Sequence, residues 1–395
     1  MIKLNKYYKE PVEKYNVLSV ALFRMPNPYK NTKIYYDGLK DLVRETAQFY
    51  PEWRMRIYFD ESVITKRHEN PIIRKEVNER WRPFLKELLK SKHVQLVQFT
   101  VDAFYSAPFH DGIFGMFMRF IPLFDFKENR NVKDVYICDI DETSAITRIK
   151  RIYPIFKKSN SQFHYGTKLC YGLTGRLLLT GRPEYPKTIC NMIMCKIKLP
   201  RRLLIGFFKK VLRHDPAVMK AIDVLKGTTM TTRGDILEPT HIKYIYYGLD
   251  EYFMNTDVMA YLIDNHIKMS ISYSFQLTHM LFYILGQAKS DTYRKLYMRL
   301  IKDTDMGKML NGRNMDQMTT KELYNVIDKE IYEKESSKAI QQIINVLENI
   351  LKTRTWDQYN LTKDHIVCAI IYRKPYDLIM VDDYVRKYKQ LSSID

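Results

Sequence analysis

Two carboxylates separated by a single residue close one of the most apolar segments of the chain. Asp139 and Asp141 end the segment 132–140, whose β-branched and aromatic residues predict a strand. Alternation along a strand would place both side chains on one face, where two negative charges repel each other unless a cation lies between them. Carboxylate oxygens suit Mg²⁺ or Mn²⁺, which can neutralise a diphosphate. The spacing therefore predicts a divalent metal site, and the simpler alternative is a pair of acids that caps the following helix.

The segments before this pair alternate between strand-like and helix-like patterns. We predict strands at 17–23, 54–59, 94–101 and 132–140, with helices at 35–49, 73–90 and 112–125 between them. This order is typical of a parallel α/β sheet covered by helices on both faces. Such open sheets bind ligands at the carboxyl ends of their strands, which is where Asp139 and Asp141 would lie.

The later part of the chain is less regular and then mainly helical. We predict a strand at 191–199, a helix after Pro200, a strand at 242–247 and a helix from Gly248 to about Ile263. An apolar stripe at steps of three and four predicts a further helix over 340–351. The composition turns more polar after residue 285, which we take as the domain boundary.

Composition sets the class of protein. The chain has 395 residues, is 46% hydrophobic and contains only 14 Gly and 15 Pro, which excludes a disordered or collagen-like protein. Its five Cys are an odd number without zinc spacing, which predicts reduced thiols in a cytosolic compartment. The start of the chain lacks a signal-peptide pattern, and no run of 18 apolar residues predicts a membrane span.

The formal charge of +19 is concentrated in one block. Residues 148–213 hold sixteen Lys or Arg and a single acid, Glu184. Such a block faces solvent or an anion, because clustered cations resist burial. We predict that part of it, including Lys196, Lys198, Arg201 and Arg202, meets a polyanion such as nucleic acid, an acidic polysaccharide or a phosphate-rich surface.

The sequence resembles GT-A-fold glycosyltransferases, which use nucleotide sugars and a D-x-D metal site. The resemblance covers about residues 15–285 and lies in the segments 53–60, 110–120, 136–141 and 247–255. In overall appearance the chain is similar to glycosyltransferase-like proteins of large DNA viruses, which implies the host cytoplasm or the virion as its location. The implied fold is a GT-A-like, Rossmann-type mixed sheet flanked by helices over residues 1–285, followed by a helical region over 286–395.

The resemblance also implies roles for the donor side of the site. Asp139 and Asp141 would hold Mn²⁺ or Mg²⁺ on the diphosphate of a nucleotide sugar, with a UDP-sugar as the first candidate. Arg119 would contact the donor phosphate or sugar, or brace the acids, and Asp60 would read the nucleoside. As simpler alternatives, Arg119 is a structural ion-pair partner and Asp60 a turn residue.

On the acceptor side, the resemblance implies that Asp250 and Glu251 bind acceptor hydroxyls or supply a general base. Asp250 lies near a predicted helix start, so it can equally be an N-cap. His266 and His279 are candidates for a third metal ligand. The implied activity is that of a hexosyltransferase, with a polyanion or a viral glycoprotein among the candidate acceptors.

Two other classes remain open. The segment 135–143 also resembles the first motif of haloacid-dehalogenase-type phosphatases, in which Asp139 would be the nucleophile. Segments 177–182 and 378–383 resemble later motifs of that family, and they would bring Thr180 and Asp382 or Asp383 beside Asp139. The third class is a catalytically inactive basic protein that binds nucleic acid or virion components.

Overall fold

The computed structural model describes residues 2–23, 32–67, 70–101, 113–142, 145–167, 185–227, 249–273, 337–356, 363–371 and 378–393. The chain divides into two compact units. The first comprises Met1–Tyr165, Ile189–Thr231 and Ile236–Lys268, and the second comprises Gly166–Thr188, Thr232–Asp235 and Met269–Asp395. The expected boundary after residue 285 lies outside the described residues and stays a prediction.

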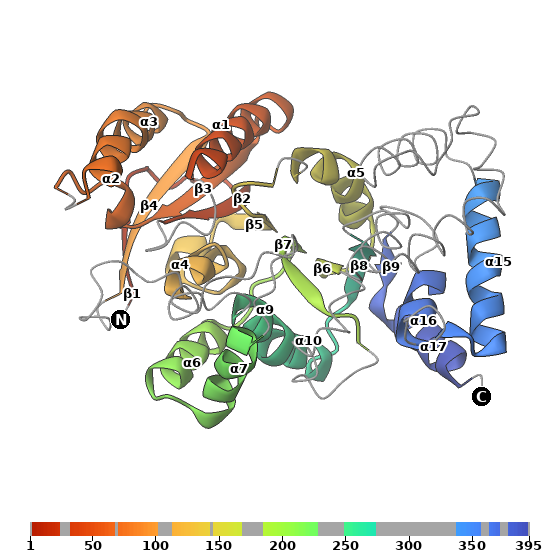
Figure 1. Cartoon of the computed structure of the whole chain (residues 1–395). Helices are drawn as coiled ribbons and strands as arrows, with labels where there is room; N and C mark the ends of the chain where they lie inside the picture. Colours follow the sequence, from red (N-terminus) through yellow and green to blue (C-terminus); the bar gives the residue numbers. More distant parts are fainter. Residues whose placement is uncertain are drawn as a thin grey trace, which may run out of the picture. The chain divides into compact units, whose positions relative to one another are not determined.

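A mixed β-sheet forms the centre of the first unit (Figure 1). Its strands are β1 (Ile2–Lys6), β2 (Tyr15–Leu22), β3 (Trp53–Phe59), β4 (Val94–Val101), β5 (Val132–Ile137), β6 (Phe163–Thr167) and β7 (Thr188–Cys195). They lie in the order β1-β4-β3-β2-β5-β7-β6. Strands β4, β3, β2 and β5 run parallel, whereas β1 is antiparallel to β4 and β7 is antiparallel to β5. The predicted α/β class and parallel core are therefore confirmed.

Two details of the sheet differ from the prediction. Strand β1 was not expected, because its alternating segment is only five residues long and contains two lysines. Strand β5 ends at Ile137, and a turn follows in which the Glu142 amide donates to the Asp139 carbonyl at 3.2 Å. Asp139 and Asp141 thus lie in that turn, so the argument from strand alternation was wrong, although both residues remain at the carboxyl end of β5.

Helices lie on both sides of the parallel strands (Figure 1). The helices of the first unit are α1 (Thr32–Phe49), α2 (Pro71–Glu76), α3 (Arg82–Leu88), α4 (Ile113–Met118), α5 (Ala145–Lys158), α6 (Arg201–Leu212), α7 (Pro216–Gly227), α9 (Leu249–Phe253) and α10 (Met259–Asp264). One π-helical turn joins α2 to α3 and another joins α9 to α10. Helices α1 and α5 pack against each other, whereas α4, α9, α7 and α6 form a second packed group.

Helix α4 is shorter than the predicted helix 112–125. It ends at Met118, and a 3₁₀ turn with Pro122 at its centre follows at Ile121–Leu123. Proline lacks the amide that would continue the helical hydrogen bonds, and it also disfavours helical geometry in the preceding residue. This early end places Arg119 just beyond the helix.

A cluster of phenylalanine rings holds the second helix group together. The Phe117 ring of α4 contacts Phe207 and Phe208 of α6 at centroid distances of 5.4 Å, and Phe253 of α9 at 5.6 Å. Phe207 and Phe253 also contact each other at 4.9 Å. Each such pair contributes roughly 0.5–1.5 kcal/mol beyond the area that it buries. The cluster therefore fixes α9 against α4.

The second unit contains an antiparallel strand pair and three described helices. The strands are β8 (Met269–Tyr273) and β9 (Ile379–Met380), and the helices are α15 (Ser337–Thr353), α16 (Lys363–Ile371) and α17 (Val381–Ser392). Helix α15 buries Ile344, Leu347, Ile350 and Leu351, as the apolar stripe predicts. The predicted strand 242–247 lies outside the described residues. Among the helices that the structure describes, none is long and apolar enough to cross a bilayer.

A glycine in α1 sets the position of the acidic turn. A Cβ atom added to Gly38 would lie 2.2 Å from the Ile140 carbonyl oxygen and 3.0 Å from the Asp141 Cα. The helix therefore packs directly on the backbone of the turn between Asp139 and Asp141. Gly206 of α6 is a contrasting case, because nothing lies within 4 Å of the position that its Cβ would take.

We predict that Gly38→Ala lowers the free energy of unfolding by about 2 kcal/mol, because backbone atoms must move to admit the methyl group. Gly206→Ala is the matched control and should stabilise the protein by up to about 1 kcal/mol through helix propensity alone. Urea unfolding of both variants measures the difference. Equal stabilisation by the two substitutions would show that α1 does not press on the acidic turn.

Candidate functional site

The strand order creates a switch point at the carboxyl edge of the parallel sheet. From β2 the chain moves to β3 and then β4 on one side, and it returns to β5 on the other side of β2. Helices that leave such neighbouring strands diverge, and open α/β sheets bind ligands in the crevice between them. Asp139 follows β5, so it lies beside this switch point. The edge predicted from the sequence is therefore the edge at which the topology favours ligand binding.

Arg119 joins the two acidic motifs of the sequence. Its Nη1 atom donates to the Asp139 carboxylate, and its Nη2 atom donates to the Asp250 carboxylate at 2.7 Å. Arg119 is 9% exposed and Asp250 only 4%, whereas the side chain of Asp139 is 40% exposed. The bridge thus runs from the interior to a carboxylate that solvent reaches. The Arg119 guanidinium therefore joins Asp139, which was predicted to serve the donor side, to Asp250, which was predicted to serve the acceptor side.

Arg119 keeps its positive charge between the two carboxylates. Burial opposes the charge, but the carboxylates of Asp139 and Asp250 outweigh burial and hold the pKa of Arg119 well above its usual value. Two of its donor atoms are engaged, and its buried Nε has no hydrogen-bond partner. The backbone carbonyl of Arg119 accepts from the Ser19 hydroxyl of β2 at 2.8 Å, which ties the residue to the sheet.

Glu251 and Cys190 complete a compact group around Asp250. One ligand atom from each of these three residues lies within 4.8 Å of the other two. Burial and the neighbouring Asp250 raise the pKa of Glu251 well above its usual value. Burial also raises the pKa of the Cys190 thiol. Sequence analysis missed Cys190, because a cysteine inside an apolar strand carries no signal that distinguishes it from a core residue.

A second ion pair lies next to the acidic turn. Arg148 of α5 pairs with Glu142 at 3.2 Å, and the Asn191 side-chain amide donates to the same carboxylate oxygen at 3.1 Å. Arg148 is 5% exposed, and its Nη1 atom has no hydrogen-bond partner. The pair anchors the start of α5 to β7. The sequence placed Arg148 only within the basic block and gave no sign of this role.

Asp60 follows β3 at the same edge of the sheet. Its Oδ1 atom accepts from the Ser62 amide at 3.0 Å and from the Ser62 hydroxyl, whereas its buried Oδ2 atom has no partner. Burial raises the pKa of Asp60 to about 7, against the opposing hydrogen bonds from Ser62. Asp60 thus caps a turn, as the simpler alternative of a turn residue predicts. Its contact with a nucleoside stays a prediction, for which the Oδ2 atom would be available.

The remaining candidates are placed as follows. Asp141 is partly buried in the turn after β5. His266 is exposed just beyond α10 with φ 53°, as in a helix-ending residue. Asp382 and Asp383 lie in the first turn of α17 in the second unit, and Asp383 pairs with Arg386 at 2.5 Å. His279 and Thr180 lie outside the described residues, so the phosphatase alternative stays open.

The basic block is not a uniform surface. Lys196 donates to the carbonyls of Phe156 and Ser159 at the end of α5, and Lys198 donates to the Pro122 carbonyl at 2.8 Å. Burial lowers the pKa of Lys198 to about 8. Both lysines thus hold backbone carbonyls of the fold, and the expectation that they meet a polyanion stays a prediction. Arg201 and Arg202 are exposed.

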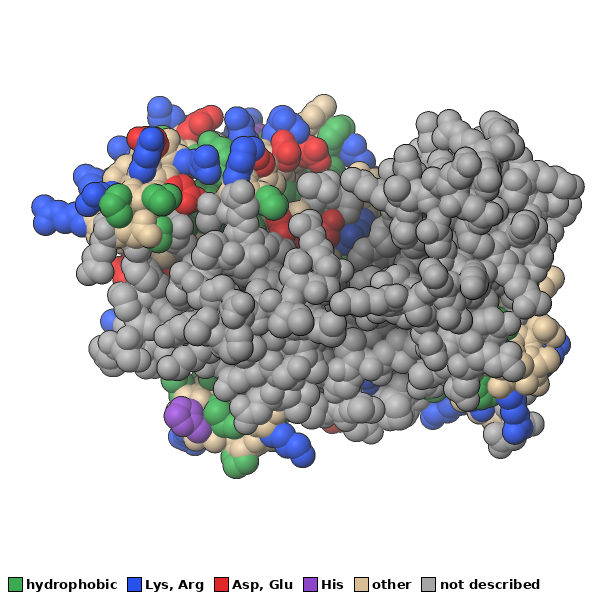
Figure 2. Space-filling model, in the orientation of Figure 1, with side chains coloured by type: hydrophobic (Ala, Val, Ile, Leu, Met, Phe, Trp, Pro, Cys, Tyr) green, Lys and Arg blue, Asp and Glu red, His purple; other side chains and the backbone are tan. Residues whose placement is uncertain are grey.

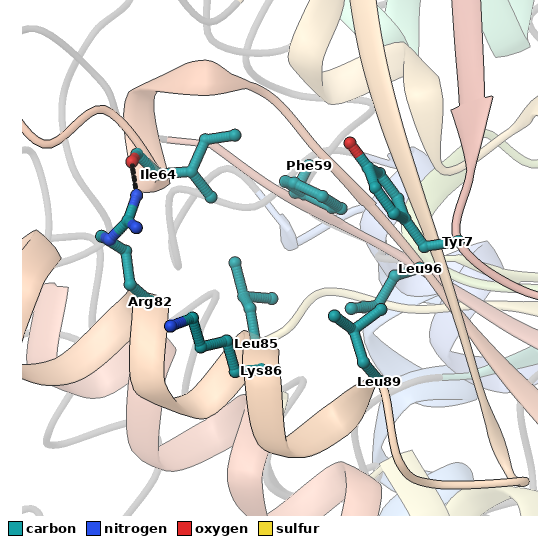
Figure 3. A pocket seen from close by; sticks show the side chains of 8 residues that line it. All are labelled: Tyr7, Phe59, Ile64, Arg82, Leu85, Lys86, Leu89 and Leu96. Atoms are coloured by element: carbon teal, nitrogen blue, oxygen red, sulfur yellow. Dashed lines mark hydrogen bonds between the residues drawn. The ribbon is translucent and has the colours of Figure 1, made fainter.

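An apolar cavity of about 190 Å³ lies between α3 and the neighbouring strands β3 and β4 (Figure 3). Phe59, Leu85 and Leu96 line it, and Arg82 closes one side by donating to the Ile64 carbonyl at 2.6 Å. Sites for drug-sized ligands usually have a volume of about 300–1,000 Å³. The cavity is therefore too small and too apolar to be the site of a nucleotide sugar.

Comparisons of the chain with protein-family models, with curated proteins and with solved structures found no match. The assignment of a function therefore depends on the geometry of the site.

We predict that Arg119→Met lowers the free energy of unfolding by about 3–5 kcal/mol, because it leaves the buried Asp250 carboxylate without its partner. Adding Asp250→Asn to that variant should recover a large part of the loss, which a double-mutant cycle by urea unfolding measures. Additive losses would show that the two side chains do not interact.

The raised pKa of Asp60 predicts a pH dependence of stability. Because the pKa of Asp60 is higher in the folded protein than in the unfolded chain, its protonated carboxyl favours the folded state. This contribution to stability is complete below the pKa of the unfolded chain and is lost as pH rises through about 7. Relative to Asp60→Asn, the wild type should therefore lose about 4 kcal/mol of stability between pH 4 and pH 8. Parallel stability curves for the two proteins across this range would contradict the prediction.

Proposed function

We propose that the protein is a metal-dependent glycosyltransferase that moves a sugar from a nucleotide-sugar donor to an acceptor hydroxyl. The observation that carries the proposal is the Arg119 bridge between Asp139 and Asp250. The two carboxylates are 111 positions apart in the sequence. A transfer reaction needs donor-side and acceptor-side groups at one place, and this arrangement supports that requirement.

The sheet supports the proposal at the level of architecture. A GT-A-like domain requires a mixed, Rossmann-type sheet with the D-x-D pair at a carboxyl edge. The first unit has parallel strands β4, β3, β2 and β5 with antiparallel β7 beside β5, and Asp139 follows β5 at the switch point. Other chemistries also use such sheets, so the residues of the site rather than the fold carry the assignment.

The residues at this edge fit a divalent cation. Asp139 and Asp141 offer carboxylate oxygens on an accessible turn, which are the ligands that Mg²⁺ and Mn²⁺ prefer. The buried group of Cys190, Asp250 and Glu251 fits less well, because a thiol is a soft ligand and Asp250 already holds Arg119. When bound, the metal would neutralise the negative charge of the departing nucleoside diphosphate.

The side chains around the bridge have separate roles in the proposed reaction. Arg119 keeps a permanent positive charge beside Asp139, where it can stabilise donor phosphate. Asp250 is held in place by that same guanidinium. Glu251, whose pKa is raised by burial and by the neighbouring Asp250, is the proposed partner of an acceptor hydroxyl or the proposed general base.

A thermal-shift panel of nucleoside diphosphates and nucleotide sugars, each with and without Mn²⁺, tests the proposal. A UDP-sugar is the first candidate, and a ligand at one hundred times its dissociation constant should add about 2.7 kcal/mol of stability. We predict that Asp141→Asn abolishes the Mn²⁺-dependent part of the shift. Asp37→Asn on α1 removes the same charge from an exposed carboxylate that pairs with Lys33, and it should change nothing.

The two outcomes are distinct. A shift that requires both nucleotide and metal, and that Asp141→Asn removes, supports the glycosyltransferase. If no nucleotide or nucleotide sugar stabilises the protein with or without Mn²⁺, the proposal is wrong. The acceptor is a separate question, for which a polyanion or a glycoprotein remains the proposed class.

A further inference from the structure

Helix α6 presents two different faces. Its inner face is apolar and packs into the phenylalanine cluster; it consists of Leu204, Phe207, Phe208 and Val211. Its outer face mixes cations with aliphatic side chains. We call this outer face the α6 surface; it consists of Arg201, Arg202, Ile205, Lys209, Leu212 and Arg213.

The spacing of these residues forms one continuous surface. Arg201, Ile205 and Lys209 follow one another at steps of four residues, and Leu212 and Arg213 continue the stripe by three and four residues. Ile205 is 36% exposed and Leu212 is 42% exposed, although most aliphatic side chains of this unit are buried. Figure 2 shows basic, hydrophobic and histidine side chains together at the α6–α7 corner in the lower left of the view.

The charge of the surface is not cancelled by its neighbours. Helix α6 contains four basic residues and no acid. The acids near it are engaged: Asp257 pairs with Lys210 at 2.6 Å, and the Asp215 carboxylate caps the backbone amides at the start of α7. The Asp125 carboxylate accepts from the backbone amide of Arg201. The side chains of Arg201, Arg202 and Lys209 are exposed, and no carboxylate forms an ion pair with them in the part of the chain that the structure describes.

We propose that the α6 surface docks the protein on a lipid bilayer that contains anionic headgroups. Its cations match the negative surface potential of such a leaflet, and Ile205 and Leu212 can enter the boundary between headgroups and acyl chains. A surface for single-stranded nucleic acid would instead be expected to combine cations with aromatic side chains that stack on bases, and the six residues of the α6 surface include none. This docking is peripheral, and it does not depend on the proposed glycosyltransferase activity.

Co-sedimentation of the full chain with vesicles tests the proposal. Vesicles of phosphatidylcholine with about one third phosphatidylserine should bind the protein, whereas pure phosphatidylcholine should not, and binding should weaken as salt is raised. Arg201→Glu with Arg202→Glu should weaken binding about 30-fold, at roughly a fivefold loss for each cation removed. Glutamate in the first turn suits the helix dipole, so this variant should remain folded.

The matched control removes the same charge elsewhere. Lys157 and Lys158 are exposed at the end of α5, and Lys157→Glu with Lys158→Glu changes the net charge by the same amount. This control should bind nearly as well as the wild type. Ile205→Ser with Leu212→Ser should weaken binding to the anionic vesicles several-fold and leave binding to heparin unchanged, because heparin offers no apolar layer.

Three results would overturn the proposal. The first is the absence of binding to anionic vesicles at low salt. The second is an equal loss in the α5 control, which would show that only net charge matters. The third is duplex or single-stranded DNA binding that Arg201→Glu with Arg202→Glu removes, while vesicle binding persists in that variant.

Discussion

The buried charge of Arg119 is the interaction on which the arrangement of the candidate site depends. A guanidinium that is 9% exposed is costly unless carboxylates surround it, and Asp139 and Asp250 supply them from segments that are far apart in the sequence. Asp250, which is only 4% exposed, could not occupy its position alone without a similar cost. The three side chains therefore stabilise one another, and the acidic turn and α9 are held at one place by charge as well as by packing.

Packing decides where that charge cluster lies. The rings of Phe117 and Phe253 bring α4 and α9 together, and Arg119 follows α4 directly because Pro122 ends the helix early. On the opposite side, Gly38 lets α1 touch the backbone of the acidic turn. Electrostatic attraction alone would not select this geometry, since ionic contacts tolerate many orientations. Packing of the apolar core fixes the positions of α4, α9 and the acidic turn, and the ion pairs then form between side chains at these positions.

The sequence predicts the parts of this structure that depend on local pattern. Four parallel strands, most helices and the location of Asp139 beside the sheet edge follow from periodicity and from the order of segments. The roles of Lys196 and Lys198 could not be predicted, because a lysine that holds buried carbonyls looks the same in sequence as a solvated one. Cys190 is a similar case, since its neighbours Asp250 and Glu251 lie far away along the chain.

Charge balance explains why the proposed function needs a cation beyond Arg119. The Arg119 guanidinium pairs with the carboxylates of Asp139 and Asp250, and Asp141 adds a third carboxylate in the same turn as Asp139. The site is thus net negative before any ligand arrives, and a diphosphate would meet repulsion from the carboxylates beside it. Arg119 offsets only part of this repulsion, because its single positive charge is shared with the two carboxylates that pair with it. A divalent cation bound to the accessible turn would remove the excess negative charge of the site. The proposed reaction therefore needs the metal because the carboxylates would otherwise repel the diphosphate.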